Sequence, residues 1–216
     1  MTRYLDGNNY STKFHDAIKF TESKQFNLDS NTTCTLDNDS LKKLVEEISS
    51  LIPNEIHKFN YGNGEIVNFG GGCGTVHPAI VCYIKQWHPN VMVNLTMGSV
   101  QTDDEVSIDF NQEKFCCWIS GNKPETLDCH VWITINDNII IDTTIGTYLN
   151  TRASKNNLKP FQQHAYGGVI YGHPKNLKYH SIANVTTNKQ PDNFTKLKYI
   201  PVVIGETAFL EAAPKN

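Results

Sequence analysis

The chain has 216 residues, enough for one domain that buries about 70% of the surface its unfolded form exposes. Hydrophobic residues make up 39% and charged residues 19% of the sequence, a balance that excludes disordered, collagen-like and coiled-coil chains. The net charge of −3, without a dense cluster of Lys and Arg, excludes nucleic acid as an expected partner.

Hydropathy predicts a cytoplasmic protein without membrane contact. No stretch approaches the ~18 apolar residues that a membrane helix needs, and the N-terminal residues lack the apolar core of a signal peptide. The 6 cysteines include no C-x-x-C pair, so neither a disulfide scaffold nor a zinc site is expected. We expect no metal and no other cofactor, and we place Cys82, Cys116, Cys117 and Cys129 in the core.

Two helices are predicted in the first half of the chain. Residues 1–40 form a polar extension with one short helix near 13–20. Apolar residues at helical spacing predict a helix over 41–52, capped by Asp39 or Ser40 and ended by Pro53. Residues 76–87 are apolar on most sides, which predicts a central, buried helix.

The second half of the chain has the period of strands. Residues 130–135 and 139–143 predict a hairpin around a turn at 136–138, with Ile135 paired to Ile139. Further strands are expected at 91–97, 106–110, 114–119, 168–171, 178–185 and 197–204. The expected fold is therefore α+β, with the central helix packed on an antiparallel sheet. We expect a single domain over 1–216, with a core at 66–146 and additional strands at 147–216.

Cys73 is the candidate nucleophile, because it lies in the glycine-rich run 68–74 and is followed in the chain by His130 and Asp142. The hairpin pairs Trp132 with Asp142, which makes Asp142 the diagonal neighbour of His130 on the same face. His130 would take the thiol proton and later return it, while Asp142 would orient the imidazole.

Neighbouring residues are candidates for substrate binding. Gly72 and Gly74 leave the Cys73 N–H open to an oxyanion, Asn68 is a possible second donor, and Trp132 can line the pocket.

The candidate residues also have simpler structural interpretations. Cys73 can be a packed small residue, His130 a structural histidine, Trp132 a core residue, and Asp142 the start of a turn with Thr143 and Thr144. The histidines at 77, 88, 164 and 173 could lie near the cleft or bind a metal, but no ligand spacing supports a metal site, so the solvated surface is their default position. Trp87 is expected in packing.

Three motifs in order resemble the transglutaminase-like superfamily of cysteine enzymes: Gly71-Gly72-Cys73, His130-Val131-Trp132 and Asp142-Thr143-Thr144. Gly70-Gly71-Gly72-Cys73 also looks like arylamine N-acetyltransferases, which use acetyl coenzyme A, although Phe69 stands where that family has an arginine. The resemblance implies a papain-like or transglutaminase-like core, a triad of Cys73, His130 and Asp142, and a core helix that begins at the cysteine.

The function expected from these residues is thioester chemistry on a peptide, amide or small acyl substrate, with a hydrolase (peptidase or amidase) as the leading interpretation. An acyltransferase and a catalytically inactive binding domain are the alternatives. Pro78 favours a helix start near Val76 with Thr75 as its cap, which would leave Cys73 on the preceding loop. The sequence gives no indication of oligomeric state.

Overall fold

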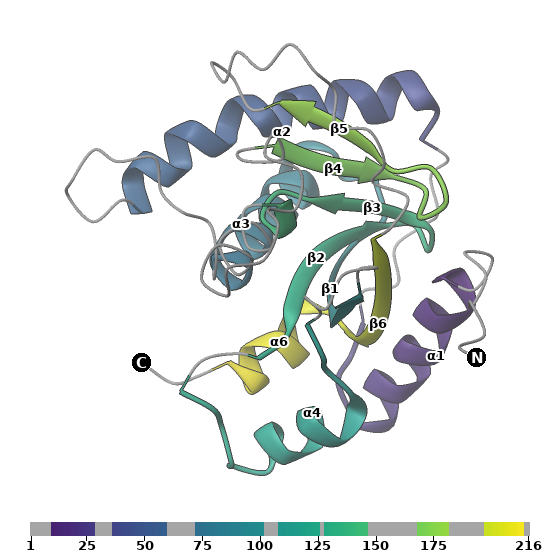
Figure 1. The fold of residues 1–216 in the computed structure, drawn as a ribbon, viewed down its shortest axis with the longest axis vertical. Helices are drawn as coiled ribbons and strands as arrows, with labels where there is room; N and C mark the ends of the chain where they lie inside the picture. The colour runs from purple at the N-terminus through teal and green to yellow at the C-terminus, as the bar shows by residue number, and fades with distance from the viewer. Residues whose placement is uncertain are drawn as a thin grey trace, which may run out of the picture.

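The computed structural model describes residues 10–28, 36–59, 72–101, 108–125, 128–146, 168–181 and 197–213. These residues form a six-stranded antiparallel sheet with the strand order β5-β4-β3-β2-β1-β6 and five helices around it (Figure 1). The predicted α+β class is therefore confirmed.

The helices are α1 (Tyr10–Ser23), α2 (Asn38–Phe59), α3 (Cys73–Trp87), α4 (Gln112–Ile119) and α6 (Glu206–Ala212). The strands are β1 (Val93–Gln101), β2 (His130–Ile135), β3 (Ile139–Asp142), β4 (Gly168–Gly172), β5 (Lys178–Ser181) and β6 (Lys198–Ile204).

Both faces of the sheet are covered by helices. On one face, apolar residues of α2, α3, α4 and α6 pack against alternate residues of β2, namely Val131, Ile133 and Ile135. On the other face, α1 packs with Trp132 in a second cluster, and Figure 1 shows α1 across the sheet from α3. Alternation along β2 thus separates the two faces as predicted. The face that carries Trp132 is also fully buried.

The central hairpin has the predicted register. Ile135 pairs with Ile139 and Ile133 with Ile141, around a turn at 136–138 in which Asn136 takes a φ of 55°. Asparagine tolerates this left-handed conformation better than most residues. β3 then pairs on its other side with β4, where Asp142 lies opposite Ile170.

One predicted strand is a helix, and one predicted helix is longer than expected. Residues 114–119 belong to helix α4, because the side chain of Asn111 caps the helix by accepting a hydrogen bond from the Lys114 N–H at 2.9 Å. Helix α2 does not end at Pro53 but continues to Phe59, and it begins after Asp37, whose carboxylate accepts the Ser40 N–H at 2.7 Å. Proline removes one hydrogen bond and disfavours a helix without always ending it.

Helix α3 begins at Cys73, with Gly72 as the residue before its first turn, and Pro78 lies inside it. The helix start near Val76 that Pro78 favoured is therefore wrong. The N–H groups of Thr75 and Val76 both bond to the Gly72 carbonyl, at 3.0 and 2.9 Å, which shows that the first turn is formed ahead of the proline. Cys73 consequently lies in that first turn.

Other expectations differ at the level of single residues. Cys82 and Cys117 are exposed rather than in the core, and Cys116 is half-buried, whereas Cys129 is buried as expected. Trp87 is 62% exposed and is not a packing residue. Of the strand expected at 106–110, Ile108 makes one bridge to Val100. The predictions for residues 106–107 and 182–185, for Asn68 and for His164 lie outside the described residues.

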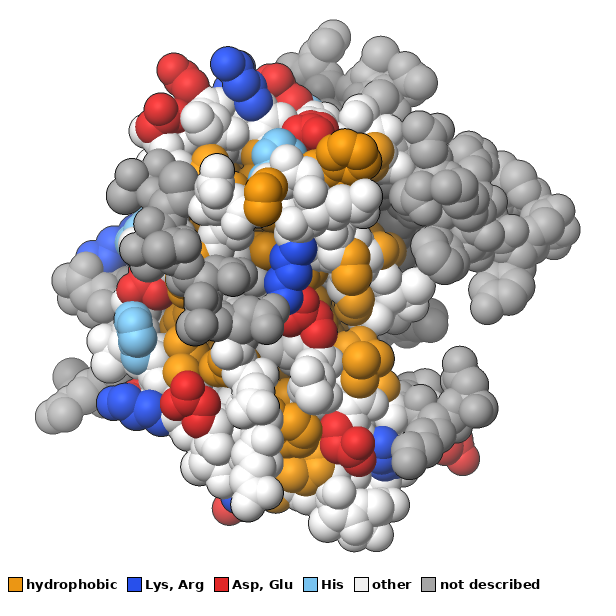
Figure 2. Space-filling view, turned by 180° about the vertical axis from the view of Figure 1, so that it is seen from behind, with side chains coloured by type: hydrophobic (Ala, Val, Ile, Leu, Met, Phe, Trp, Pro, Cys, Tyr) orange, Lys and Arg blue, Asp and Glu red, His pale blue; other side chains and the backbone are white. Residues whose placement is uncertain are grey.

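The surface opposite the view of Figure 1 is chemically mixed. Figure 2 shows apolar side chains in separate small areas there, with acidic and basic side chains between them. Within the described ranges of the chain, no helix is long and apolar enough to cross a bilayer.

Candidate functional site

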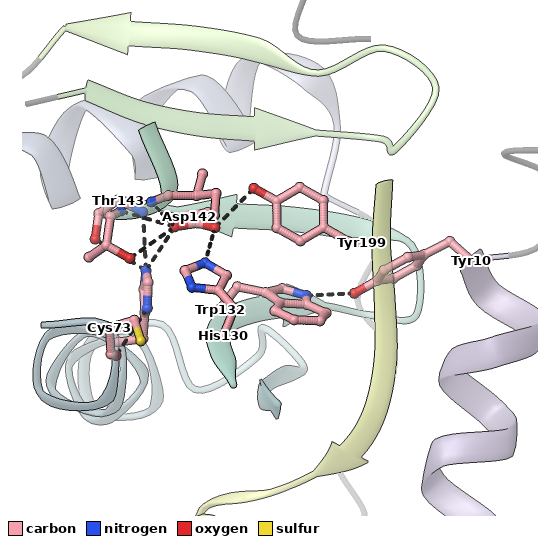
Figure 3. A network of polar contacts seen from close by, with 10 residues as sticks. Tyr10, Cys73, His130, Trp132, Asp142, Thr143 and Tyr199 are labelled. Carbon is pink, nitrogen blue, oxygen red and sulfur yellow. Dashed lines mark hydrogen bonds and ion pairs between the residues drawn. The ribbon is translucent and has the colours of Figure 1, made fainter. Parts of the chain in front are cut away.

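Cys73, His130 and Asp142 come together at one end of the sheet. His130 opens β2 and Asp142 ends the neighbouring antiparallel strand β3, so both lie at the same sheet end. Cys73 opens α3, which packs on β1 and β2, and Figure 3 shows its side chain on the side of this helix that faces His130. The hairpin and one helix start thus supply all three side chains.

The His130 ring lies between Asp142, which binds it, and the Cys73 side chain. Its Nε2 lies 2.6 Å from Oδ2 of Asp142, which leaves Nδ1 as the ring nitrogen open to another partner. The Cys73 side chain lies beside the ring and adds to the raised pKa of His130. His130 and Asp142 are buried, whereas Cys73 is half-buried and hence partly accessible.

The two carboxylate oxygens of Asp142 accept hydrogen bonds from different groups. Oδ1 accepts the backbone N–H groups of Thr144 and Ile145, at 2.9 and 3.1 Å, and thereby forms the turn after β3. Oδ2 accepts from His130 and from the hydroxyl of Tyr199, at 2.9 Å. The two interpretations of Asp142 as a turn residue and as the partner of His130 therefore both apply.

The electrostatics of the pair favour the charged forms of both groups. Burial lowers the pKa of His130, but the charge and hydrogen bond of Asp142, together with Cys73, outweigh burial and raise this pKa to about 10. Burial raises the pKa of Asp142, but the charge and hydrogen bond of His130 outweigh burial and hold this pKa below its usual range. At neutral pH the pair is an imidazolium and a carboxylate.

His77 is a fourth residue of the site, and its expected place on the surface is wrong. Its side chain is fully buried on α3, one turn after Cys73. Nδ1 lies 3.1 Å from the Cys73 carbonyl oxygen, and Nε2 accepts the Thr143 N–H at 3.1 Å. Nε2 is also 3.6 Å from Oδ1 of Asp142. Of the other histidines, His173 is exposed as expected, whereas His88 is partly buried against Glu47.

Trp132 belongs to a buried polar network behind the site. Its ring stacks on that of His130, with centroids 6.0 Å apart, and its Nε1–H donates to the Tyr10 hydroxyl at 2.8 Å. The Tyr10 hydroxyl is 2.7 Å from Oγ1 of Thr134. Because Trp132 is fully buried between β2 and α1, it supports the His130 ring rather than lining an open pocket.

The remaining predicted residues lie at the helix start. Gly72 precedes α3 and Gly74 is its second residue, so the Cys73 and Gly74 N–H groups belong to the first turn, where amides have no acceptor within their own helix. These two amides are suited to stabilise a negative oxygen next to the thiol. Asn68 lies outside the described residues. In the part of the chain that the structure describes, no three His, Cys, Asp or Glu side chains form a group that could hold a metal ion.

His77 was expected on the surface by default and Tyr199 was not singled out, because their contacts are distant in sequence. His77 reaches Thr143 across 66 positions, and Tyr199 reaches Asp142 across 57. The only local signal for His77 is its spacing of four residues after Cys73, which places both on one face of a helix. No local signal points from Tyr199 to Asp142.

Comparisons of this chain with models of protein families, with curated proteins and with solved structures found no match.

Proposed function

We propose that the protein is a cysteine-nucleophile enzyme of the papain-like or transglutaminase-like type that acts on an acyl or amide substrate through a thioester. The observation that carries the proposal is the position of His130 between the Asp142 carboxylate and the Cys73 side chain, with the pKa of the ring raised to about 10. A histidine that is positively charged and oriented beside a thiol favours the thiolate, which is the nucleophilic form.

The chemistry follows from these positions. The Cys73 thiolate attacks the substrate carbonyl carbon and forms a C–S bond, while the carbonyl oxygen takes the negative charge near the Cys73 and Gly74 amides. His130 donates its proton to the leaving amine or alcohol as the C–N or C–O bond breaks. In the second half, His130 takes a proton from water as the water oxygen attacks the thioester carbon; the C–S bond then breaks, Cys73 leaves as the thiolate, and the carboxylic acid is released. Asp142 stabilises the imidazolium throughout.

The first test uses alkylation by iodoacetamide at pH 6, read at each cysteine by peptide mass spectrometry. An ordinary thiol of pKa ~8.5 is under about 1% ionised at this pH, so it reacts slowly. Cys82 and Cys117 are more exposed than Cys73 and serve as internal controls. We expect Cys73 to react about tenfold faster than both, or more, because the proposed mechanism sets the charged His130 ring beside its sulfur, and we expect His130→Ala to remove the advantage.

Equal reactivity of Cys73, Cys82 and Cys117 in the folded protein would contradict the proposal.

A second experiment measures the reaction of the protein with p-nitrophenyl acetate. We expect an initial burst of p-nitrophenol and an acetyl group on Cys73, detected by intact mass. Both are expected to be absent in Cys73→Ala. Release of acetate in water supports a hydrolase, whereas product formed only with an added amine supports an acyltransferase. Absence of both the alkylation preference and the acyl adduct contradicts the enzyme and favours the alternative, a catalytically inactive binding domain.

A further inference from the structure

His77 joins the residue that carries the thiol to the turn that follows the carboxylate. On the helix side, its Nδ1 is 3.1 Å from the backbone carbonyl of Cys73. On the sheet side, its Nε2 is 3.1 Å from the backbone N of Thr143 and 3.2 Å from Oγ1 of that residue. Thr143 directly follows Asp142 in the chain, so one buried ring connects α3 to the end of β3.

The partners of His77 fix its tautomer. A carbonyl oxygen only accepts and a backbone N–H only donates, so Nδ1 must carry the hydrogen and Nε2 must be the acceptor. The neutral ring satisfies both bonds, whereas a protonated ring would turn an N–H toward the Thr143 N–H. Burial lowers the pKa of His77 to about 4, with the charge of His130 acting in the same direction and Asp142 against it. The neutral form is therefore the one present at neutral pH.

We propose that His77 is a positioning residue, which holds Cys73 at the distance from His130 and Asp142 that thiolate formation requires. The inference rests on the proposed function. The groups that face His77 are Cys73 on its own helix, His130 on β2, whose ring centroid is 6.3 Å away, and Asp142 and Thr143 at the end of β3. Since no substrate atom is needed for this role, the reactivity of Cys73 alone reports on it.

The test compares three variants of His77 with a histidine variant at the other end of α3. His77→Leu removes both hydrogen bonds. The amide of His77→Asn reaches the position of Nδ1 and keeps the donor to Cys73, and that of His77→Gln reaches the position of Nε2 and keeps the acceptor for Thr143. His88→Asn is the matched control, because His88 lies at the end of α3 far from Cys73 and contacts Glu47.

The measurement is the rate of Cys73 alkylation from pH 5 to pH 9, with Cys82 and Cys117 as internal references and thermal unfolding as a check of folding. We expect His77→Leu to slow Cys73 by about 10- to 100-fold at pH 6 and to move its pH profile toward that of the reference cysteines. The Asn and Gln variants should lie between wild type and Leu, and His88→Asn should match wild type.

The outcomes separate the inference from the proposed function. If His77→Leu folds and keeps the wild-type profile of Cys73, or only unfolds at a lower temperature, the positioning role is overturned while the loss in His130→Ala still supports the enzyme. If His77→Leu does not fold, wild-type profiles in both the Asn and Gln variants overturn the inference. If wild-type Cys73 shows no advantage over Cys82 and Cys117, it is the proposed function that fails.

Discussion

The carboxylate of Asp142 is fixed by donors on both of its oxygens. Thr144 and Ile145 hold Oδ1 through their backbone N–H groups, while Oδ2 accepts from His130 and Tyr199. A carboxylate that completes a turn cannot rotate without losing those bonds, so Oδ2 stays directed at the imidazole. A turn residue thereby becomes a rigid orienting group, and the pKa of Asp142 is held below its usual range.

The Asp142→Asn variant tests this role because it preserves the turn. The amide oxygen can still accept the Thr144 and Ile145 N–H groups, but an NH₂ group then faces Nε2 of His130. His130 must accept at Nε2 and carry its hydrogen on Nδ1, where it can no longer take the thiol proton. We expect turnover to fall by roughly 10³-fold or more, as when the buried aspartate of a catalytic triad is replaced.

The same variant should also lower the pKa of His130, because burial remains while the two contributions of Asp142 are lost. An NMR titration of the His130 ring in wild type and in Asp142→Asn measures this directly. Loss of the imidazolium at pH 7 in the variant is the expected result. A ring that still titrates near its wild-type value would show that Asp142 does not set its charge.

Among the elements, β1 and β6 approach each other closely at Gly98, where the pairing register shifts. A Cβ at this position would lie 2.1 Å from the Ile200 carbonyl oxygen and 2.6 Å from the Trp132 ring. The contact with a backbone oxygen cannot be relieved by rotating a side chain. Glycine at this position thus allows Trp132 to stack under His130.

Gly98→Ala is expected to destabilise the protein by about 1–3 kcal/mol, because the added methyl group forces β6 or Trp132 to move. Urea unfolding followed by fluorescence measures the change. Gln101→Ala, at the exposed end of the same strand, should change stability by less than ~0.5 kcal/mol. A Gly98→Ala protein as stable as wild type would show that the two strands can separate at no cost.

How far an element could be predicted depended on whether its signal is local. The hairpin of β2 and β3 follows from alternation and an Asn-rich turn, and its register came out as expected. Residues 114–119 looked like a strand because they are rich in aromatic residues and cysteine. They form a helix because Asn111 caps its N-terminus and the negative charge of Glu113 lies in its first turn. Pro78 gave a misleading signal, since the packing of α3 on β1 and β2 tolerates a proline after the first turn.

At the scale of the whole molecule, the site is supported from both faces of the sheet. His77 reaches it from α3 on one face, while Tyr199 and the chain of contacts from Trp132 to Tyr10 of α1 support it from the other. Cys73, His130 and Asp142 could be predicted as candidate catalytic residues, because a cysteine, a histidine and an aspartate follow one another along the chain in the order of known cysteine enzymes. The supporting residues could not, because their contacts depend on how distant segments pack and not on any spacing in the chain.

The two buried histidines should give the stability of the protein opposite dependences on pH. The pKa of His130 is raised from 6.5 to about 10, so its stabilising contribution is complete below pH 6.5 and is lost as pH rises toward 10. The pKa of His77 is lowered from 6.5 to about 4, so its contribution is complete above pH 6.5 and is lost as pH falls toward 4. Asp142 adds a further loss only below pH 4, because its pKa is lowered from 3.8.

Maximum stability is therefore expected near pH 6.5, with a fall of up to about 1.4 kcal/mol per pH unit on either side from these two groups. Urea unfolding at intervals from pH 4 to pH 10 measures the two limbs. His77→Leu should flatten the acid limb between pH 4 and 6.5, and His130→Gln the alkaline limb, whereas His88→Asn should leave both in place. A wild-type stability that rises steadily to pH 9 would mean that His130 is not held as an imidazolium, and the thiolate would then lack its counter-ion.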